Sequence, residues 1–291
     1  MKAVFLKINI LIIGLFITGI NFKPNKIETS ESIEKTFQGK AYYFSKSKME
    51  LGRWGARLTE EQKKQVAERL KNRLEKTYIL TFNKEESFFK EEEKLDAMSG
   101  ATDSWGKNFS PGDQYKNVKT NTQIQNQEFY GKKFLVKDKL QEINWEMGKE
   151  TKVIGKYTCF KATASIPTSE LTWYDFSWSK LRNQNSASEN KDENSTEEKD
   201  VEIPMTEVEA WYTVQIPVRH GPLDYWGLPG LILEVSAGNT TILCSKVVMN
   251  PKDKNEIKAP NKGQEITKTD YQKTIVEKMK EFRNNRGRRR R

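Results

Sequence analysis

The feature that most constrains this fold is a series of short strand-like segments with no helix between them. Between residues 115 and 164 these segments read YKNVKT, TQIQNQEFY, KFLVKD, INWEMGKE, TKVIG and KYTCFKATA. Turn signals separate them at Gly131-Lys132, Asp138-Lys139, Gly148-Lys149 and Gly155-Lys156. Parallel strands need a crossover of a dozen or more residues, so the short connections predict an antiparallel sheet.

Further strand-like segments and two helical segments complete the pattern. The strands read AYYFSKSKME, TYILTFN, SFFKEEE, TEVEAWYTVQIPV, LILEV and TTILCSKVVM. Residues 58–76 predict a helix with a capping box at Thr59 and Gln62. A last helix begins near Thr267 or Thr269 and places Tyr271, Ile275, Met279 and Phe282 on one face. The predicted fold is mainly β (α+β): a single large, curved antiparallel sheet of about ten strands, half-closed and barrel-like, with one helix near each end.

The chain ends differ in character from this β-rich domain, which spans residues 41–282. Lys2 and Lys7 precede an apolar stretch over residues 8–20, which is shorter than the roughly 20 residues that span a bilayer. Residues 1–20 therefore predict a cleaved signal peptide, with an uncleaved inner-membrane anchor as the alternative. A polar segment follows over residues 21–40. We expect an exported protein in the periplasm or associated with the outer membrane.

Two further polar regions interrupt or end the domain. Residues 183–200, NQNSASENKDENSTEEKD, contain no large apolar residue and predict a disordered insertion. The formal net charge of +10 lies mostly in an arginine-rich tail, residues 283–291. In an exported protein this tail does not predict a nucleic-acid partner. It predicts either a solvated helix end or contact with anionic lipid through Arg286, Arg288, Arg289, Arg290 and Arg291.

The two cysteines, Cys159 and Cys244, lie in different strand-like segments. Export to an oxidising compartment permits a disulfide between them. Two buried, unpaired thiols that act as small hydrophobic side chains are equally compatible with the sequence. Both alternatives stay open at this point.

The stretch HGPLDYWGLPGLILEV, residues 220–235, contains a further turn signal that is followed by an apolar run. In Leu228-Pro229-Gly230-Leu231, proline stands at the second turn position and glycine at the third, which predicts a type II turn. The turn would begin a buried strand with Leu231, Leu233 and Val235 on one face. The residues of this predicted structural corner are Gly221, Pro222, Gly227, Leu228, Pro229 and Gly230.

The first half of that stretch predicts an exposed loop with four candidate ligand-binding residues: His220, Asp224, Tyr225 and Trp226. His220 is the only histidine in the chain. No G-x-S-x-G, H-E-x-x-H, C-x-x-C or phosphate-binding glycine motif occurs. We therefore predict no catalytic residue, metal or cofactor. A hydrolase that uses His220 is the alternative.

Several of these motifs resemble the GLPGLI family of bacterial envelope proteins. They are YILTFNKEESFFKEE, INWEMGKETKVIGKYTCFKATA, VEAWYTVQIPV and GPLDYWGLPGLILEV, which contains GLPGLI at Gly227–Ile232. The resemblance implies an exported Gram-negative envelope protein, often encoded beside outer-membrane receptors, with no established activity. We expect a binding or accessory protein whose partner is an outer-membrane receptor, or an apolar or peptide ligand in the concavity of the sheet. A structural envelope protein that docks on anionic lipid through its arginine tail is a further alternative.

Overall fold

The computed structural model describes residues 37–48, 55–92, 110–178, 203–252 and 256–288. The predicted signal peptide, the predicted insertion at 183–200, most of the polar segment 21–40 and Arg289, Arg290 and Arg291 lie outside the described residues. The described residues form one sheet of twelve strands in the order β12-β6-β5-β4-β3-β2-β1-β11-β10-β9-β8-β7. Only β12 and β6 pair in parallel; every other neighbouring pair described is antiparallel.

The strands of the sheet follow the predicted segments closely. In chain order they are β1 (Gly39–Ser47), β2 (Glu75–Phe82), β3 (Glu86–Glu91), β4 (Gln114–Asn117), β5 (Thr122–Phe129), β6 (Lys132–Lys139), β7 (Glu146–Ile154), β8 (Tyr157–Pro167), β9 (Met205–Thr213), β10 (Leu231–Ala237), β11 (Thr240–Met249) and β12 (Gln264–Ile266). The prediction of a turn at Gly148 is wrong, because Gly148 lies inside β7, where the pairing with β8 is irregular between Met147 and Thr151. Such an irregularity bends a strand without ending it.

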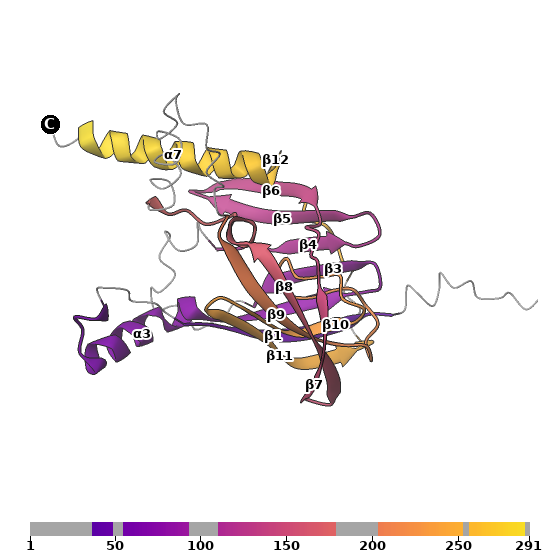
Figure 1. The fold of residues 1–291 in the computed structure, drawn as a ribbon. Helices are drawn as coiled ribbons and strands as arrows, with labels where there is room; N and C mark the ends of the chain where they lie inside the picture. The colour runs from indigo at the N-terminus through magenta and orange to yellow at the C-terminus, as the bar shows by residue number, and fades with distance from the viewer. Residues whose placement is uncertain (1–36, 49–54, 93–109, 179–202, 253–255, 289–291) are drawn as a thin grey trace, which may run out of the picture.

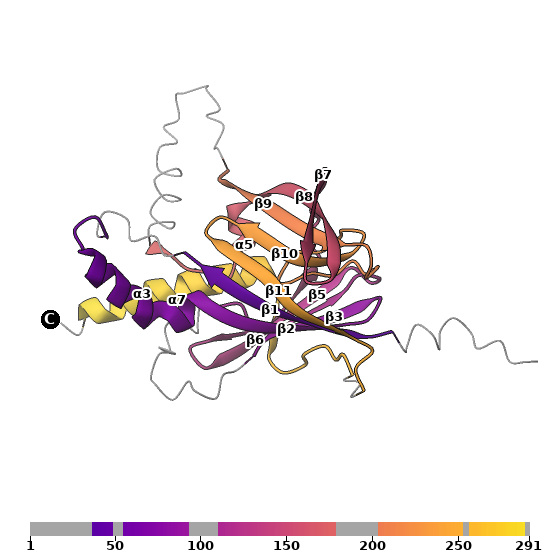
Figure 2. The same ribbon diagram turned by 90° about the horizontal axis from the view of Figure 1, so that it is seen from below.

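The sheet is strongly curved but does not close, and β12 and β7 are its two edges. Figures 1 and 2 show that it bends back on itself, so that β8, β9 and β10 face β3–β6 across the interior. The prediction of a mainly antiparallel, curved sheet is confirmed. The sheet has twelve strands among the described residues, where about ten were expected.

Among the described residues, three helices accompany the sheet: α3 (Glu60–Leu74), α5 (Thr168–Leu171) and α7 (Lys268–Arg288). The capping box of α3 is present, since Gln62 N donates to Thr59 Oγ1 at 3.3 Å and Thr59 N donates to Gln62 Oε1 at 2.9 Å. In Figure 1, α7 (yellow) runs along the β12–β6 end of the sheet. The two predicted helices are thus confirmed, and α5 is an additional turn of helix. No helix of the described residues is long and apolar enough to cross a membrane.

The core consists of three clusters of buried side chains. The first joins β1–β3 to β8–β11, the second lies against β8–β10, and the third lies between β5, β6 and α7. Cys159 and Cys244 both belong to the first cluster and are free thiols. Burial raises the pKa of both thiols, that of Cys244 to about 11. Of the two alternatives for the cysteines, the structure has the buried, unpaired one.

Strand β10 carries buried side chains on both faces. Leu231 and Leu233 were predicted to share one face, and both belong to the first cluster. Val235 was expected to join them, but it packs with Ile232 in the second cluster. The reason is a bulge: the pairing of β10 with β9 shifts between Ile232 and Glu234, so Leu233 is an extra residue and the alternation reverses after it.

Candidate functional site

The connection between β9 and β10, residues 214–230, is fastened to the sheet by the buried side chain of Lys116. Its Nζ donates to the backbone oxygens of Gly221 at 2.9 Å, Leu223 at 2.5 Å and Tyr225 at 3.3 Å. Three carbonyl oxygens match the three N–H groups of an ammonium ion. Burial lowers the pKa of Lys116 to about 7, and the nearby Asp224 carboxylate opposes this shift. Lys116 therefore holds the predicted ligand loop in place from the inside.

Asp224 is the second charged group of this arrangement, and it is also buried. Its Oδ1 accepts from Gln114 Nε2 at 2.7 Å and from Gln123 Nε2 at 2.5 Å. Gln114 Nε2 also donates to Gln125 Oε1 at 3.3 Å. We call Lys116, Asp224 and these glutamines the Lys116 clamp.

Sequence reasoning missed the Lys116 clamp. The available signal was the alternation of glutamines in TQIQNQEF, where Gln123, Gln125 and Gln127 point to one face of β5 and are buried. A polar face that alternates with apolar residues is normally the solvent face of a strand. Here it is the inner face, because the loop brings Asp224 and backbone carbonyl groups to cover it.

His220 lies in the core and is fully buried. Its Nε2 lies 3.1 Å from the backbone oxygen of Asn83, to which a neutral ring with its proton on Nε2 donates. Its backbone oxygen accepts from Ile232 N at 3.1 Å. Burial, and then the charge of Lys116, lower the pKa of His220 to about 3. The ring is thus a neutral core group, and this position gives no support to the hydrolase alternative.

Two aromatic residues complete the predicted ligand loop. Tyr225 is buried, whereas Trp226 is half-buried. The Trp226 indole donates to the backbone oxygen of Gln141 at 2.6 Å, and the Trp145 indole donates to the backbone oxygen of Trp226 at 2.8 Å. The expectation that this loop is exposed is wrong for His220, Asp224 and Tyr225. Ligand binding by the four residues stays a prediction.

The corner that leads into β10 has a different geometry from the predicted type II turn. Gly230 does not have the positive φ that this turn requires, and Leu231 N donates to Ile216 O at 3.0 Å. Gly230 is instead needed for close approach, since a Cβ there would lie 2.1 Å from Thr213 O. The positive φ, 98°, belongs to Gly227. The corner does begin a buried strand, as predicted.

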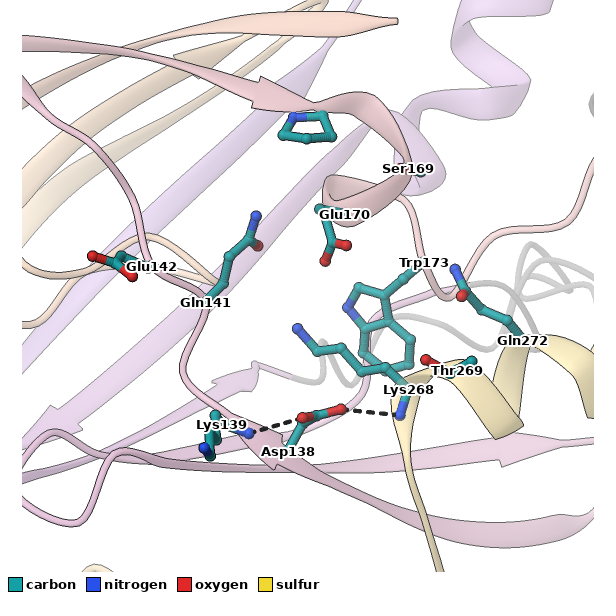
Figure 3. Close-up of a pocket in the computed structure, with 11 residues that line it drawn as sticks. Asp138, Lys139, Gln141, Glu142, Ser169, Glu170, Trp173, Lys268, Thr269 and Gln272 are labelled. Atoms are coloured by element: carbon teal, nitrogen blue, oxygen red, sulfur yellow. Dashed lines mark hydrogen bonds between the residues drawn. The ribbon is translucent and has the colours of Figure 1, made fainter. Parts of the chain in front are cut away.

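An open cleft of about 510 Å³ lies between the end of β6, α5 and the start of α7 (Figure 3). We call it the Trp173 cleft. Trp173 is only 2% exposed, and the Lys268 ammonium lies over its ring at 5.4 Å from the centroid. Figure 3 shows the indole nitrogen on the side of the ring that faces Gln141 and Glu170. Neither Trp173 Nε1 nor Gln141 Oε1 has a hydrogen-bond partner among the described residues.

The charged groups of the Trp173 cleft are less fully paired than those of the Lys116 clamp. Asp138 accepts from the backbone N–H groups of Lys139 at 2.9 Å and Lys268 at 3.3 Å, at the positive end of α7. In the part of the chain that the structure describes, no ion pair joins Glu170 to Lys268. Glu170 is exposed, and its carboxylate points into the cleft in Figure 3. No sequence motif marks this site, because α5 and α7 are about a hundred residues apart.

The cleft and the predicted ligand loop are connected by one hydrogen bond. Trp226 donates to Gln141 O, and Gln141 forms one wall of the cleft. Trp226 therefore fixes the backbone of that wall, while the Lys116 clamp fixes the loop that carries Trp226. The loop supports a site that it does not itself form.

Comparison with known proteins yields a partial family match and a distant structural likeness. No curated protein sequence matches the chain. Two solved structures of PNGF-II, in the C2 and P21 space groups, are similar at 14% and 15% identity with TM-scores of 0.47 and 0.48. Each match covers 82% of this chain but 33% of PNGF-II, so the chain spans about a third of that protein's length. Residues 145–234, which include the loop and its corner, match the family model described as "Protein of unknown function (Porph_ging)".

Proposed function

We propose that the protein is an exported binding protein of the Gram-negative cell envelope, of the GLPGLI type, and that its ligand occupies the Trp173 cleft. The GLPGLI hexapeptide at Gly227–Ile232 falls within the matched residues 145–234, which supports the family part of the proposal. The apolar N-terminal stretch and that resemblance support the envelope location.

The observation that carries the proposal is the indole N–H of Trp173, a buried residue that lines the cleft: this donor has no partner among the described residues and lies on the side of the ring that faces Gln141 and Glu170. Buried polar groups in proteins are nearly always hydrogen-bonded, so an unpaired donor at the wall of a cleft favours a ligand. The concavity of the sheet was the expected ligand position. The concavity is filled by the core clusters and by the loop that the Lys116 clamp holds. We therefore propose the Trp173 cleft as the ligand site instead.

The experiment is native mass spectrometry of the protein purified from its own envelope fraction. Thr269→Trp places a large side chain in the cleft from an exposed position at the start of α7. Glu277→Trp is the matched control, because Glu277 is exposed on the same helix and does not line the cleft. We expect a bound small molecule on the wild type and on Glu277→Trp, and none on Thr269→Trp. Equal occupancy of all three proteins, or an empty wild type, would contradict the proposal.

A further inference from the structure

We infer that the Trp173 cleft selects a small zwitterion, a molecule with both a carboxylate and an ammonium group, such as an amino acid or a short peptide with free ends. This inference rests on the proposed function, because it names the class of ligand for the same cleft. Two observations support it: some polar groups of the cleft have no partner among the described residues, and residues of opposite charge line the cleft without an ion pair between them.

One side of the cleft offers hydrogen-bond donors. The Trp173 indole can only donate, and it has no acceptor within the described residues. The Lys268 ammonium also lines the cleft, beside the same indole. Figure 3 shows the Lys268 side chain reaching past the Trp173 ring toward Gln141. An N–H and an ammonium side by side are the complement of a carboxylate.

The other side offers acceptors. Glu170 presents its carboxylate to the cleft, and the buried Oε1 of Gln141 has no donor within the described residues. A carboxylate and a carbonyl oxygen together are the complement of an ammonium group. The cleft therefore presents hydrogen-bond donors on one side and acceptors on the other, and each side suits a ligand group of opposite charge.

Lys268 and Glu170 do not form an ion pair with each other in the part of the chain that the structure describes. Lys268 is held over the face of Trp173, a position in which a cation is attracted by the ring. Because the ammonium group is already ordered in this position, it can bind a ligand without the entropy cost of being immobilised. A zwitterion could bind between Glu170 and Lys268, with its ammonium group beside Glu170 and its carboxylate beside Lys268.

The charges that surround the cleft disfavour simpler ligands. Three acidic residues line it, Asp138, Glu142 and Glu170, against two lysines, Lys139 and Lys268. An anion alone would meet more negative than positive charge, and a cation alone would leave the Trp173 donor unpaired. The volume of about 510 Å³ lies within the usual range for small-molecule sites, roughly 300–1,000 Å³.

The test is isothermal titration calorimetry of the full chain with three probes: dialanine, N-acetyl-dialanine and dialaninamide. The acetyl analogue lacks the ammonium group, and the amide lacks the carboxylate. We expect dialanine to bind and each analogue to bind about tenfold more weakly or worse, because each loses a charge-assisted hydrogen bond.

Two variants assign the two ends of the ligand. Lys268→Met should remove the preference for dialanine over dialaninamide, and Glu170→Gln should remove the preference over N-acetyl-dialanine. Lys280→Met and Glu277→Gln are matched controls on the exposed side of α7, and they should keep both preferences. These changes are at partly or fully exposed positions, so the variants should stay folded.

The outcomes separate this inference from the proposed function. Equal affinity for the three probes would overturn the inference that the ligand is a zwitterion. The same holds if the preferences for dialanine over its two analogues survive in both Lys268→Met and Glu170→Gln. A protein that carries an envelope ligand displaced by Thr269→Trp, but that does not bind dialanine, would also overturn it and leave the proposed function standing. An empty envelope-purified protein that binds no probe would overturn both.

Discussion

The Lys116 clamp and the Trp173 cleft contain the same kinds of residues, yet they differ in where their charged groups find partners. In the clamp, the Lys116 ammonium donates to backbone oxygens of the loop, and the Asp224 carboxylate accepts from glutamine side chains of the sheet. In the cleft, Lys268 and Glu170 face each other without an ion pair, and Trp173 Nε1 has no partner among the described residues. Charged groups that find their partners inside the molecule indicate a structural role, whereas charged and polar groups left unpaired beside an open surface indicate a binding role.

The largest expected effect comes from removing the central group of the clamp. Lys116→Met keeps the length of the side chain but leaves three carbonyl oxygens and the Asp224 charge without their cation. Breaking one partner of a buried ionic arrangement costs about 3–5 kcal/mol, so we expect a loss of that size in the free energy of unfolding. Urea denaturation measures it.

The matched control is Lys137→Met on β6, since Lys137 is exposed. That substitution should change the free energy of unfolding by less than about 0.5 kcal/mol. If Lys116→Met is as mild as Lys137→Met, the clamp does not hold the loop, and the contrast between the two regions is lost.

The next effect comes from the corner beside the clamp. In Gly230→Ala the new methyl group would lie 2.1 Å from Thr213 O, so the backbone must move. We expect a loss of about 1–3 kcal/mol, as for other overpacked positions. Gly238→Ala is the comparison, because no atom lies within 4 Å of its added Cβ and its cost arises only from the positive φ of 53°. Thermal unfolding of the two variants should rank Gly230→Ala as the less stable.

The fold was accessible from the sequence because turn signals and strand periodicity are local. The capping box at Thr59 and Gln62 was predicted correctly for the same reason. So were Tyr271, Ile275 and Met279 on the buried face of α7, whereas Phe282, expected on the same face, is exposed. The bulge at Leu233 was not predicted, since it depends on the partner strand β9. The Trp173 cleft was missed because it is assembled from side chains on β6, α5 and α7, whose proximity no local pattern encodes.

A smaller effect tests His220 as a member of the buried interior. Its pKa is about 3 in the folded protein and about 6.5 when exposed. Between these values the unfolded chain binds one more proton at His220, so the contribution of His220 to stability is complete well above pH 6.5 and is lost as the pH decreases toward 3. The slope should approach about 1.4 kcal/mol per pH unit.

The chain has one histidine, so the region between pH 5.5 and 6.5 isolates this effect from Glu209 and Asp270, whose carboxyl groups are lowered in pKa from 4.5 and 3.8 and bind protons in the unfolded chain mainly below that region. Urea unfolding across this interval should show the slope in the wild type and a flatter profile in His220→Gln. Identical profiles would mean that the ring titrates normally and is accessible, which would restore it as a candidate site residue.

The smallest effect on stability tests the connection between the two regions. Trp226→Phe keeps an aromatic ring but removes the indole N–H that donates to Gln141 O at 2.6 Å. We expect a loss of about 1 kcal/mol in the free energy of unfolding, the usual net value of one hydrogen bond. Because Gln141 forms a wall of the Trp173 cleft, dialanine should also bind severalfold more weakly, although Trp226 is not a lining residue. Trp145→Phe removes the next hydrogen bond along the same segment, from Trp145 to Trp226 O, and should act in the same direction. Stability loss without any change in affinity would show that the loop and the cleft are independent.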